Sequence, residues 1–157
     1  MTPAKVELPF QREPGCEDLP LPGYATSGAA GMDLSAAIPS DAPVTLSPGK
    51  RVLVSTGLRI AVPAGYEAQI RPRSGLAVKH GVGMVNAPGT IDSDYRGVVH
   101  VLLINWGEEP VIIRRGDRIA QMVIAPVTHV TLMETVEMEP TARGEGGFGS
   151  TGMGQID

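Results

Sequence analysis

Short apolar runs rich in β-branched residues follow one another along the chain, and turn-forming glycines and prolines separate them. Residues 66–71 alternate strictly, with apolar side chains at the even positions and polar side chains at the odd ones. Such alternation buries one face of an extended segment, so it predicts a half-buried β-strand. Further strands are predicted at residues 5–10, 50–62, 98–105, 111–114, 118–124 and 127–132, with a short one between residues 39 and 48.

Only one segment favours a helix. Residues 76–80 form a plausible helical turn, and the Ser74 hydroxyl is of the type that caps a helix N-terminus. The sequence contains no internal repeat, heptad pattern or domain linker. The elements therefore predict a single, mostly antiparallel β domain.

The composition supports this fold class. The 157 residues include 20 glycines and 14 prolines, while the hydrophobic fraction of 42% is ordinary for a globular protein. This combination is typical of many short strands joined by tight turns, and the length suits one domain. We expect one all-β domain over residues 1–157, with an N-terminal extension at 1–18 and a mobile, glycine-rich C-terminal tail at 139–157.

Charge and cysteine content exclude several functional classes. The formal net charge of −4 argues against a general nucleic-acid binder, so any positive field for an anionic ligand must be local. The single cysteine, Cys16, forms neither an internal disulfide nor a thiolate metal site. The sequence has no signal-peptide core and no apolar run of transmembrane length, so we expect a cytoplasmic protein with no membrane partner.

The densest polar cluster lies at residues 86–97, between two apolar runs. It contains Asp92, Asp94, Tyr95 and Arg96 after a Pro88-Gly89 turn signal. The following run, 98–104, is almost continuously apolar, which predicts that the cluster lies at one end of a β-hairpin. A solvated turn explains the two aspartates equally well when this stretch is taken alone.

Three other stretches carry candidate chemistry. Residues 27–37 are small except for Asp33, and residues 71–75 join arginines, a hydroxyl and a glycine in a combination suited to binding an anion. The tail from Arg143 is glycine-rich and includes Phe148, a ring that can stack on a planar ligand. Each stretch also has a structural explanation: residues 27–37 as a tightly packed strand, residues 71–75 as a plain helix cap beside surface arginines, and the tail as a flexible end. Gln121 interrupts an apolar strand, and a hydrogen-bond partner in the core would explain it as well as a ligand would.

Five ordered motifs strongly resemble those of the trimeric dUTPases, the deoxyuridine triphosphate nucleotidohydrolases. They read AAGMDL at 29–34, RSGL at 73–76, GTIDSDYRG at 89–97, GDRIAQM at 116–122 and RGEGGFGSTG at 143–152. The resemblance implies a jelly-roll-like β barrel of the β-clip type with a flexible C-terminal arm. It also implies a homotrimer with three active sites at subunit junctions. The implied reaction is the Mg²⁺-dependent hydrolysis of dUTP to dUMP and pyrophosphate, which keeps uracil out of DNA and supplies dUMP for thymidylate synthesis.

The resemblance also implies residue roles. Asp92 resembles the general base that activates water, and Asp33 the acid that holds hydrated Mg²⁺ through its waters. Phosphate contacts are implied for Arg73, Ser74, Gly75 and Gln121 and, from the tail, for Arg143, Gly149, Ser150 and Thr151. Nucleoside contacts are implied for Asn86, Gly89, Thr90, Ile91 and the main chain of His100 around uracil, for Tyr95 against the deoxyribose and for Phe148 stacked on the base.

Two departures and three alternatives stay open at this point. Val98 stands where many relatives carry a polar residue, and the C-terminus lacks the basic residue that some relatives have. A dCTP deaminase, or a bifunctional deaminase and dUTPase, shares this fold, and a non-catalytic nucleotide-binding regulator would keep the same pocket. A zinc deaminase is excluded because one cysteine cannot supply a Cys-x-x-Cys pair.

Overall fold

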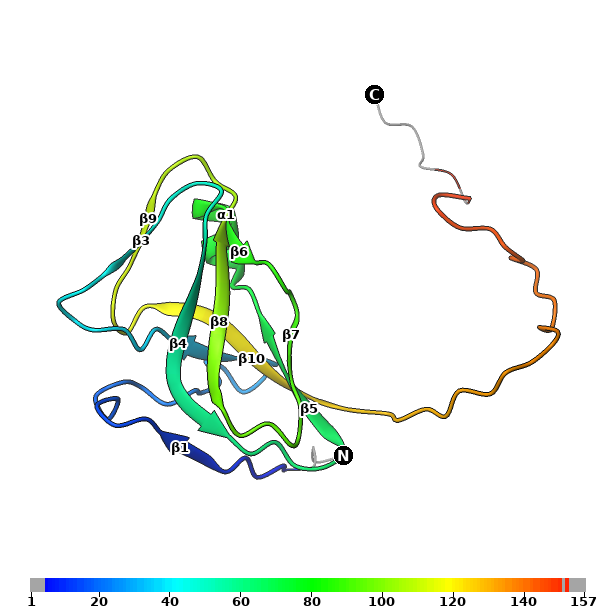
Figure 1. Cartoon of the computed structure of the whole chain (residues 1–157), viewed down its shortest axis with the longest axis horizontal. Coiled ribbons are helices and arrows are strands. Elements are labelled where there is room, and N and C mark those ends of the chain that lie inside the picture. The colour runs from blue at the N-terminus through cyan, green and yellow to red at the C-terminus, as the bar shows by residue number, and fades with distance from the viewer. Residues whose placement is uncertain (1–4, 151, 153–157) are drawn as a thin grey trace.

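Ten strands and one short helix form the body of the part of the chain that the computed structural model describes, residues 5–150 and 152 (Figure 1). All the strand pairings are antiparallel, and the helix follows the fifth strand. The elements in chain order are β1 (Phe10–Arg12), β2 (Met32–Ser35), β3 (Val44–Leu46), β4 (Arg51–Ile60), β5 (Tyr66–Arg71), α1 (Ser74–His80), β6 (Val82–Met84), β7 (Gly89–Ile91), β8 (Val98–Asn105), β9 (Val111–Ile113) and β10 (Arg118–Pro126).

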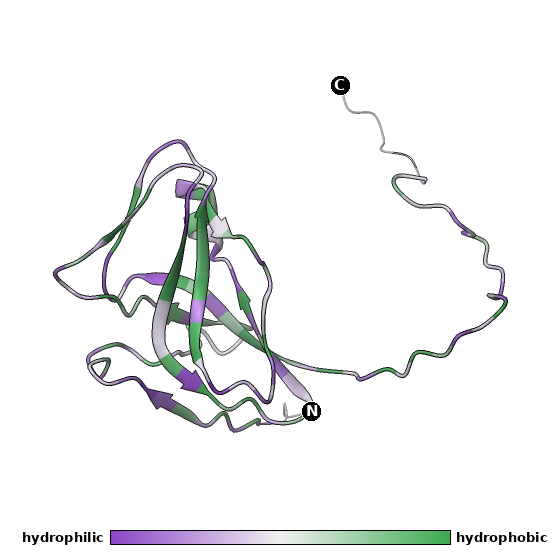
Figure 2. Ribbon diagram, viewed as in Figure 1, coloured by the Kyte–Doolittle hydropathy of each residue, from purple (hydrophilic) through white to green (hydrophobic). Residues whose placement is uncertain are grey.

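Two four-stranded sheets enclose the core. Their strand orders are β1-β4-β8-β6 and β2-β10-β5-β7, and the pair β3-β9 forms a separate small sheet. Figure 2 shows β8 as hydrophobic along most of its length, as expected for a strand in the middle of its sheet. The core joins side chains from both sheets, among them Leu34, Ile70 and Met122 from one and Val101 and Leu103 from the other. Burial of each such side chain stabilises the folded state by roughly 1.5–3 kcal/mol relative to leaving it exposed to water.

The alternation at residues 66–71 is confirmed. β5 spans those residues, and Ala68 and Ile70 are buried while Arg71 is exposed. The strands predicted near 50–62, 98–105, 111–114 and 118–124 are also present as β4, β8, β9 and β10, and β3 lies between residues 39 and 48.

Two predicted strands are wrong. Residues 5–9 are irregular and the first strand begins only at Phe10, because pairing with β4 starts at the contact between Phe10 and Ile60. Residues 127–132 continue past β10 without strand pairing. A strand needs a neighbour to accept its hydrogen bonds, and in the described part of the chain β2 and β5 pair with β10 only as far as Pro126. An apolar pattern alone therefore did not suffice at either place.

The predicted hairpin around residues 86–97 is confirmed, because β6 before this stretch and β8 after it pair antiparallel, with Met84 opposite Leu103. The strand β7, which lies within the loop of this hairpin, adds to the other sheet. β7 pairs with β5 in one sheet, and β8 pairs with β6 and β4 in the other. The stretch that joins β7 to β8, residues 92–97, therefore crosses from one sheet to the other. The polar cluster consequently lies at a sheet-to-sheet crossing at one end of the body.

The helix is present, but Ser74 is not its cap. Arg73 occupies the N-cap position without a side-chain cap hydrogen bond, and Ser74 is the first helical residue. An arginine side chain has no hydrogen-bond acceptor, so it cannot cap the first N–H groups of the helix. At the other end, Gly81 adopts the left-handed conformation with φ 66° that commonly ends a helix.

An ion pair fastens the N-terminal segment to the turn before β10. Arg115 donates hydrogen bonds to both carboxylate oxygens of Asp18, at 3.0 and 2.7 Å, and to the carbonyl of Ile38. The hydrogen bond with Arg115 lowers the pKa of Asp18, and the same bond raises the pKa of Arg115. Both groups lie at the surface, so we expect this contact to fix the geometry of the turn more than to stabilise the fold.

Candidate functional site

A cluster of one carboxylate and two guanidinium groups lies where β2, β10 and the start of α1 meet. Arg73 Nε donates to Asp33 Oδ1 at 2.9 Å, and Arg118 Nη1 donates to Asp33 Oδ2 at 3.2 Å. Arg73 Nη1 also donates to the main-chain carbonyl of Arg118 at 3.2 Å. The structure thus brings together Asp33 and Arg73, which are 40 residues apart in the sequence. We call Asp33, Arg73, Arg118 and Gln121 the carboxylate–arginine cluster.

Gln121 joins this cluster from the middle of β10. It pairs with Asp33 of β2 on one side and with Arg71 of β5 on the other. Its amide Nε2 donates to the carbonyl of Pro72 at 2.9 Å, which satisfies the polar group inside the strand. A side chain at position 31 would collide with the Gln121 amide in its present place and would displace it. Gln121 therefore holds the turn between β5 and α1 beside Asp33.

The helix start adds main-chain donors next to the cluster. The first N–H groups of any helix lack acceptors within it, and here they belong to Ser74, Gly75 and Leu76. The side chain of Ser74 and the glycine after it are exposed. These N–H groups and the nearby arginines together can receive an anion.

The second group of predicted residues lies on and after β7. Gly89, Thr90 and Ile91 form this strand, and Asp92 follows it with an exposed side chain. The Asp92 carbonyl accepts a hydrogen bond from the Tyr95 N–H at 3.2 Å, which closes a turn. The Asn86 side chain lies against Gly89, and the Asn86 to Gly97 stretch, which we call the central loop, leads into β8.

Tyr95 has a fixed position in this loop. Its hydroxyl donates to the carbonyl of Val98 at 3.0 Å, and its ring lies over Gly97, where any side chain would collide with it. Arg96 Nη1 donates to the carbonyls of Ser93 and Tyr95, both at 2.8 Å, and so ties the loop to itself. The His100 ring contacts the Val98 carbonyl through Nδ1 at 2.9 Å. The role expected for His100 concerns its main chain, not this ring.

The two groups lie at opposite ends of the same sheet. Gly89 pairs with Ile70 and Ile91 with Ala68, so Asp92 continues toward the start of β5 while Arg73 follows its end. Asp92 and Arg71 are therefore separated by roughly 13 Å along the strand direction, at about 3.3 Å per residue. Figure 1 shows the same separation, with α1 beside the end of β8 and the central loop leading into its start. Within one chain, the structure does not bring Asp92 and Arg73 together.

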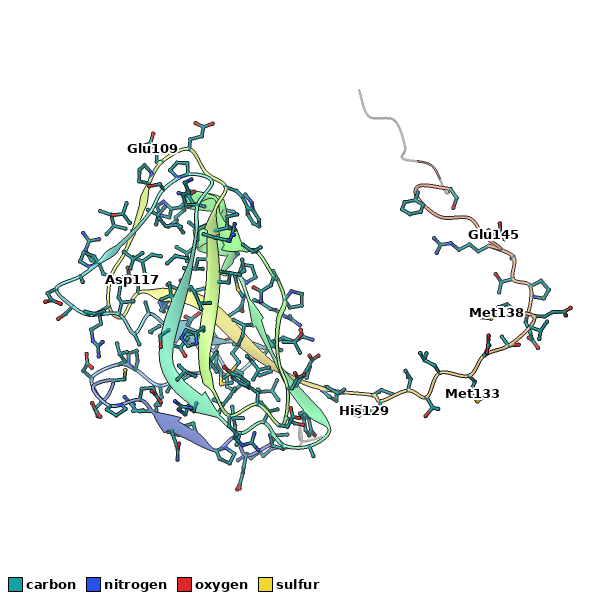
Figure 3. The ribbon with its side chains drawn as sticks, viewed as in Figure 1. Glu109, Asp117, His129, Met133, Met138 and Glu145 are labelled. Carbon is teal, nitrogen blue, oxygen red and sulfur yellow. The ribbon has the colours of Figure 1, made fainter. Side chains whose placement is uncertain are left out.

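The third group lies on the C-terminal arm, residues 127–152, which extends away from the body (Figure 1). Figure 3 shows His129, Met133, Met138 and Glu145 along this arm with no other segment beside them. Arg143 Nε donates to the Gly146 carbonyl at 2.8 Å, and Phe148 is fully exposed in a left-handed conformation with φ 45°. Gly149 and Ser150 follow in a tight turn. Thr151, also predicted as a phosphate contact, lies outside the described residues.

Sequence reasoning missed Arg118 as a site residue. It stands in the GDRIAQM motif three residues before Gln121, yet nothing in the alternation of β10 marks it as special. Its contact with Asp33 joins residues that are 85 positions apart in the sequence, and the pairing of β10 with β2 shifts register between Arg118 and Ala120. One signal could have indicated it: Arg118 is a charged residue at the start of a predicted strand, and it shares a motif with Gln121, which was already a candidate ligand.

The chain matches a family model described as dUTPase over residues 17–152. It is 60% identical over 151 residues to the deoxyuridine 5'-triphosphate nucleotidohydrolase of Caulobacter vibrioides, and the match covers 96% of this chain and 97% of that protein. A mutant dUTPase of Staphylococcus bacteriophage 80alpha with dUpNHpp has a similar structure, with a TM-score of 0.80 at 24% identity over 95% of this chain and 100% of that one. A mutant dUTPase from phage phi11 of S. aureus, whose structure shows the coordination of a structural Mg(II) ion, has a TM-score of 0.73 at 22% identity over 84% of this chain and 98% of that one.

Proposed function

Because this chain belongs to the dUTPase family, it hydrolyses dUTP, releasing dUMP and pyrophosphate, and we propose that Asp92 activates the attacking water. Water is a poor nucleophile and needs a carboxylate within hydrogen-bond reach to orient it and accept its proton. Asp92 suits this role because it is exposed and directly follows β7, whose pairing with β5 fixes its position. The activated water attacks the α-phosphorus, and the bond to the oxygen that bridges the α and β phosphorus atoms breaks.

The phosphate chain is held by the helix start and the carboxylate–arginine cluster. The N–H groups of Ser74 and Gly75 and the guanidinium of Arg73 present donors to phosphate oxygens, with Ser74 near the bridging oxygen and Gln121 as a further ligand. Negative charge spreads over these oxygens in the transition state of phosphoryl transfer. Donors that are already in place stabilise that charge without reorganising.

Mg²⁺ fits the donor set of this cluster when it arrives with the nucleotide. Mg²⁺ keeps several waters and binds through phosphates and one or two carboxylates, and Asp33 is a partly exposed carboxylate in such a place. Among the residues that the structure describes, no three histidine, cysteine, aspartate or glutamate side chains gather at one place. The proposed site therefore relies on phosphate oxygens and water as the main ligands of Mg²⁺. When bound, Mg²⁺ supplies positive charge to the phosphate oxygens, and Asp33 would hold its waters.

The central loop reads the nucleoside. Asn86, the main chain of residues 89–91 and the main chain of His100 present donors and acceptors to the edges of uracil. Tyr95, held over Gly97, packs against the deoxyribose and leaves no room for a 2′-hydroxyl. Fixed main-chain groups discriminate strongly because a base with the wrong edge leaves buried polar groups unpaired.

One observation carries the proposal that the site is shared between chains. A general base must reach a water that also reaches the α-phosphorus, yet one chain places Asp92 and the helix start at opposite ends of β5. Two copies are needed to complete one site. A closed ring of three copies supplies three equivalent junctions, so we propose a homotrimer.

The outer face of the central sheet supports association. Leu53 of β4 is 60% exposed and pairs with Leu102 of β8 on the face that points away from the core. Val98 begins β8 and is the first residue of the mostly apolar run at 98–104. An exposed apolar surface of this kind favours contact with another copy of the chain.

The C-terminal arm would close over the nucleotide. Phe148 would stack on uracil, Arg143 would bind the terminal phosphate, and Gly149, Ser150 and Thr151 would surround the phosphate chain. Closure of a mobile segment excludes water and completes a catalytic site. The full exposure of Phe148 supports this role because a large ring in solvent lacks an apolar contact.

Hydrolysis of dUTP keeps uracil out of DNA and supplies dUMP for thymidylate synthesis. No helix among the described residues has the length and apolar character needed to cross a bilayer. We propose the cytoplasm as the compartment, since deoxynucleotides are used there and the single Cys16 suits a reducing setting.

A substrate panel tests the assignment. The full-length chain, incubated with Mg²⁺ and separately with dUTP and each of the four common deoxynucleoside triphosphates, is expected to release pyrophosphate only from dUTP. Ammonia release from dCTP would instead indicate the deaminase that shares this fold. Binding of dUTP without pyrophosphate release would indicate a non-catalytic regulator.

A further inference from the structure

Asp33 has a different guanidinium on each of its carboxylate oxygens. Arg73 Nε lies 2.9 Å from Oδ1 and Arg118 Nη1 lies 3.2 Å from Oδ2. The side chain of Arg73 is 24% exposed, whereas that of Arg118 is 61% exposed. The proposed mechanism gives tasks to Asp33 and Arg73 but none to Arg118.

Arg73 cannot keep its contact with Asp33 and also bind phosphate through the fork formed by Nε and Nη2. Its Nε is given to Asp33 and its Nη1 to the carbonyl of Arg118. Arginine binds phosphate most strongly with two parallel N–H donors. Binding of a phosphate through that fork therefore requires Arg73 to release Asp33.

The release of Arg73 would leave Asp33 with Arg118 as its partner. A carboxylate with only Arg73 beside it would accept both donors of that fork and hold the arginine firmly. In the structure Arg118 donates to Oδ2, and Arg73 donates to Oδ1 through Nε. Two guanidinium groups around one carboxylate also leave a net positive charge facing the incoming phosphates.

We propose that Arg118 is a positioning residue, which holds Asp33 in place while Arg73 exchanges between Asp33 and the triphosphate. This inference rests on the proposed function, because the exchange requires a nucleotide at the helix start. Arg118 acts through Asp33 and needs no contact with substrate. Its removal would strengthen the Arg73–Asp33 pair while no nucleotide is bound, and would leave the carboxylate without a partner once Arg73 has moved to the triphosphate.

Binding of dUpNHpp to the full-length chain, measured by calorimetry over a series of Mg²⁺ concentrations, tests this role. Arg118→Gln is expected to weaken binding about tenfold and to raise the Mg²⁺ concentration needed for half-saturation, as loss of a group that orients a metal-associated carboxylate does. Arg118→Lys should recover part of the loss because it keeps the charge and one donor. Thermal unfolding of each variant checks that the fold is intact.

Arg114→Gln is the matched control. Arg114 is exposed and, like Arg118, lines the cleft of about 570 Å³ between α1 and β9. The hydrogen bond that it makes to Asp117 comes from its main-chain N–H and is retained in the variant. Equal losses of affinity in the two variants would mean that only the positive charge matters, and would overturn the positioning role.

A double-mutant cycle with Asp33→Asn separates action through Asp33 from direct contact. Arg118→Gln should cause no further loss of affinity in the Asp33→Asn background, because the partner through which it acts has changed. A second tenfold loss in that background would show that Arg118 binds the nucleotide itself, and an unchanged affinity in the single variant would also refute the inference. A wild-type chain that fails to bind dUpNHpp would contradict the proposed function instead, so the two failures are distinguishable.

Discussion

Replacing Asp92 with asparagine is expected to lower the rate of dUTP hydrolysis by about a thousandfold, within the range that general bases contribute. An amide accepts a hydrogen bond but does not take a proton from water at neutral pH. Pyrophosphate release under saturating dUTP measures the effect. Binding of dUpNHpp should be retained or slightly tighter, because the substitution removes a negative charge that faces the phosphates.

Asp94→Asn provides the control for this variant. It makes the same chemical change two residues along the same exposed turn, where the account assigns no contact with substrate. We expect a far smaller loss of rate and unchanged thermal unfolding in both variants. Equal losses in the two would indicate a general disturbance of the turn, and an Asp92→Asn variant with near-normal turnover would rule out Asp92 as the base.

Removal of the residues from Arg143 onward is expected to leave a folded protein with turnover reduced on the order of a hundredfold, because several phosphate donors and the exclusion of water are lost together. The fold should survive because, among residues 143–150 and 152, the hydrogen bonds join arm residues to one another. Arg143 and Gly146 exchange two of them, and Gly144 bonds only to Thr141. Pyrophosphate release and thermal unfolding of the 1–142 chain measure the two effects separately.

Phe148→Ala and Arg143→Ala in the full-length chain divide this loss. The aromatic substitution should mainly raise KM through lost stacking, and the arginine substitution should mainly lower the rate through lost charge on the terminal phosphate. Full turnover by the 1–142 chain would contradict a lid role for the arm. Unfolding of the 1–142 chain at a markedly lower temperature would instead show that the arm stabilises the fold, which contradicts the expected intact fold.

Local pattern was enough to predict most of the strands, and the failures have a physical cause. β5 was predictable residue by residue because its two faces meet different environments, which alternation records directly. Residues 127–132 carry the same kind of apolar signal, but a strand also needs a hydrogen-bonding neighbour. The hairpin of β6 and β8 around the central loop was predicted, whereas the pairing of β7 with β5 depends on the order of strands in the other sheet, which no local pattern records.

The sequence indicated candidate site residues and, through the family resemblance, sites at subunit junctions, but it did not indicate which candidates one chain brings together. The ordered motifs indicated Asp33, Arg73 and Asp92, and the structure joins the first two through a direct ion pair. The separation of Asp92 from both follows from the register of β7 on β5, which no single motif contains. Arg118 escaped notice for a related reason, because its contact with Asp33 joins residues 85 positions apart in the sequence.

Activity recovered from two inactive chains tests the shared site most directly. Asp92→Asn and Arg73→Ala chains, unfolded together in equal amounts and refolded, form mixed oligomers in which some junctions combine the intact Asp92 of one chain with the intact Arg73 of another. Random assembly makes about a quarter of the junctions intact, so we expect about a quarter of wild-type pyrophosphate release, while each variant refolded alone stays inactive. A mixture no more active than its two parents would show that Asp92 and Arg73 serve the same chain, and would contradict the account.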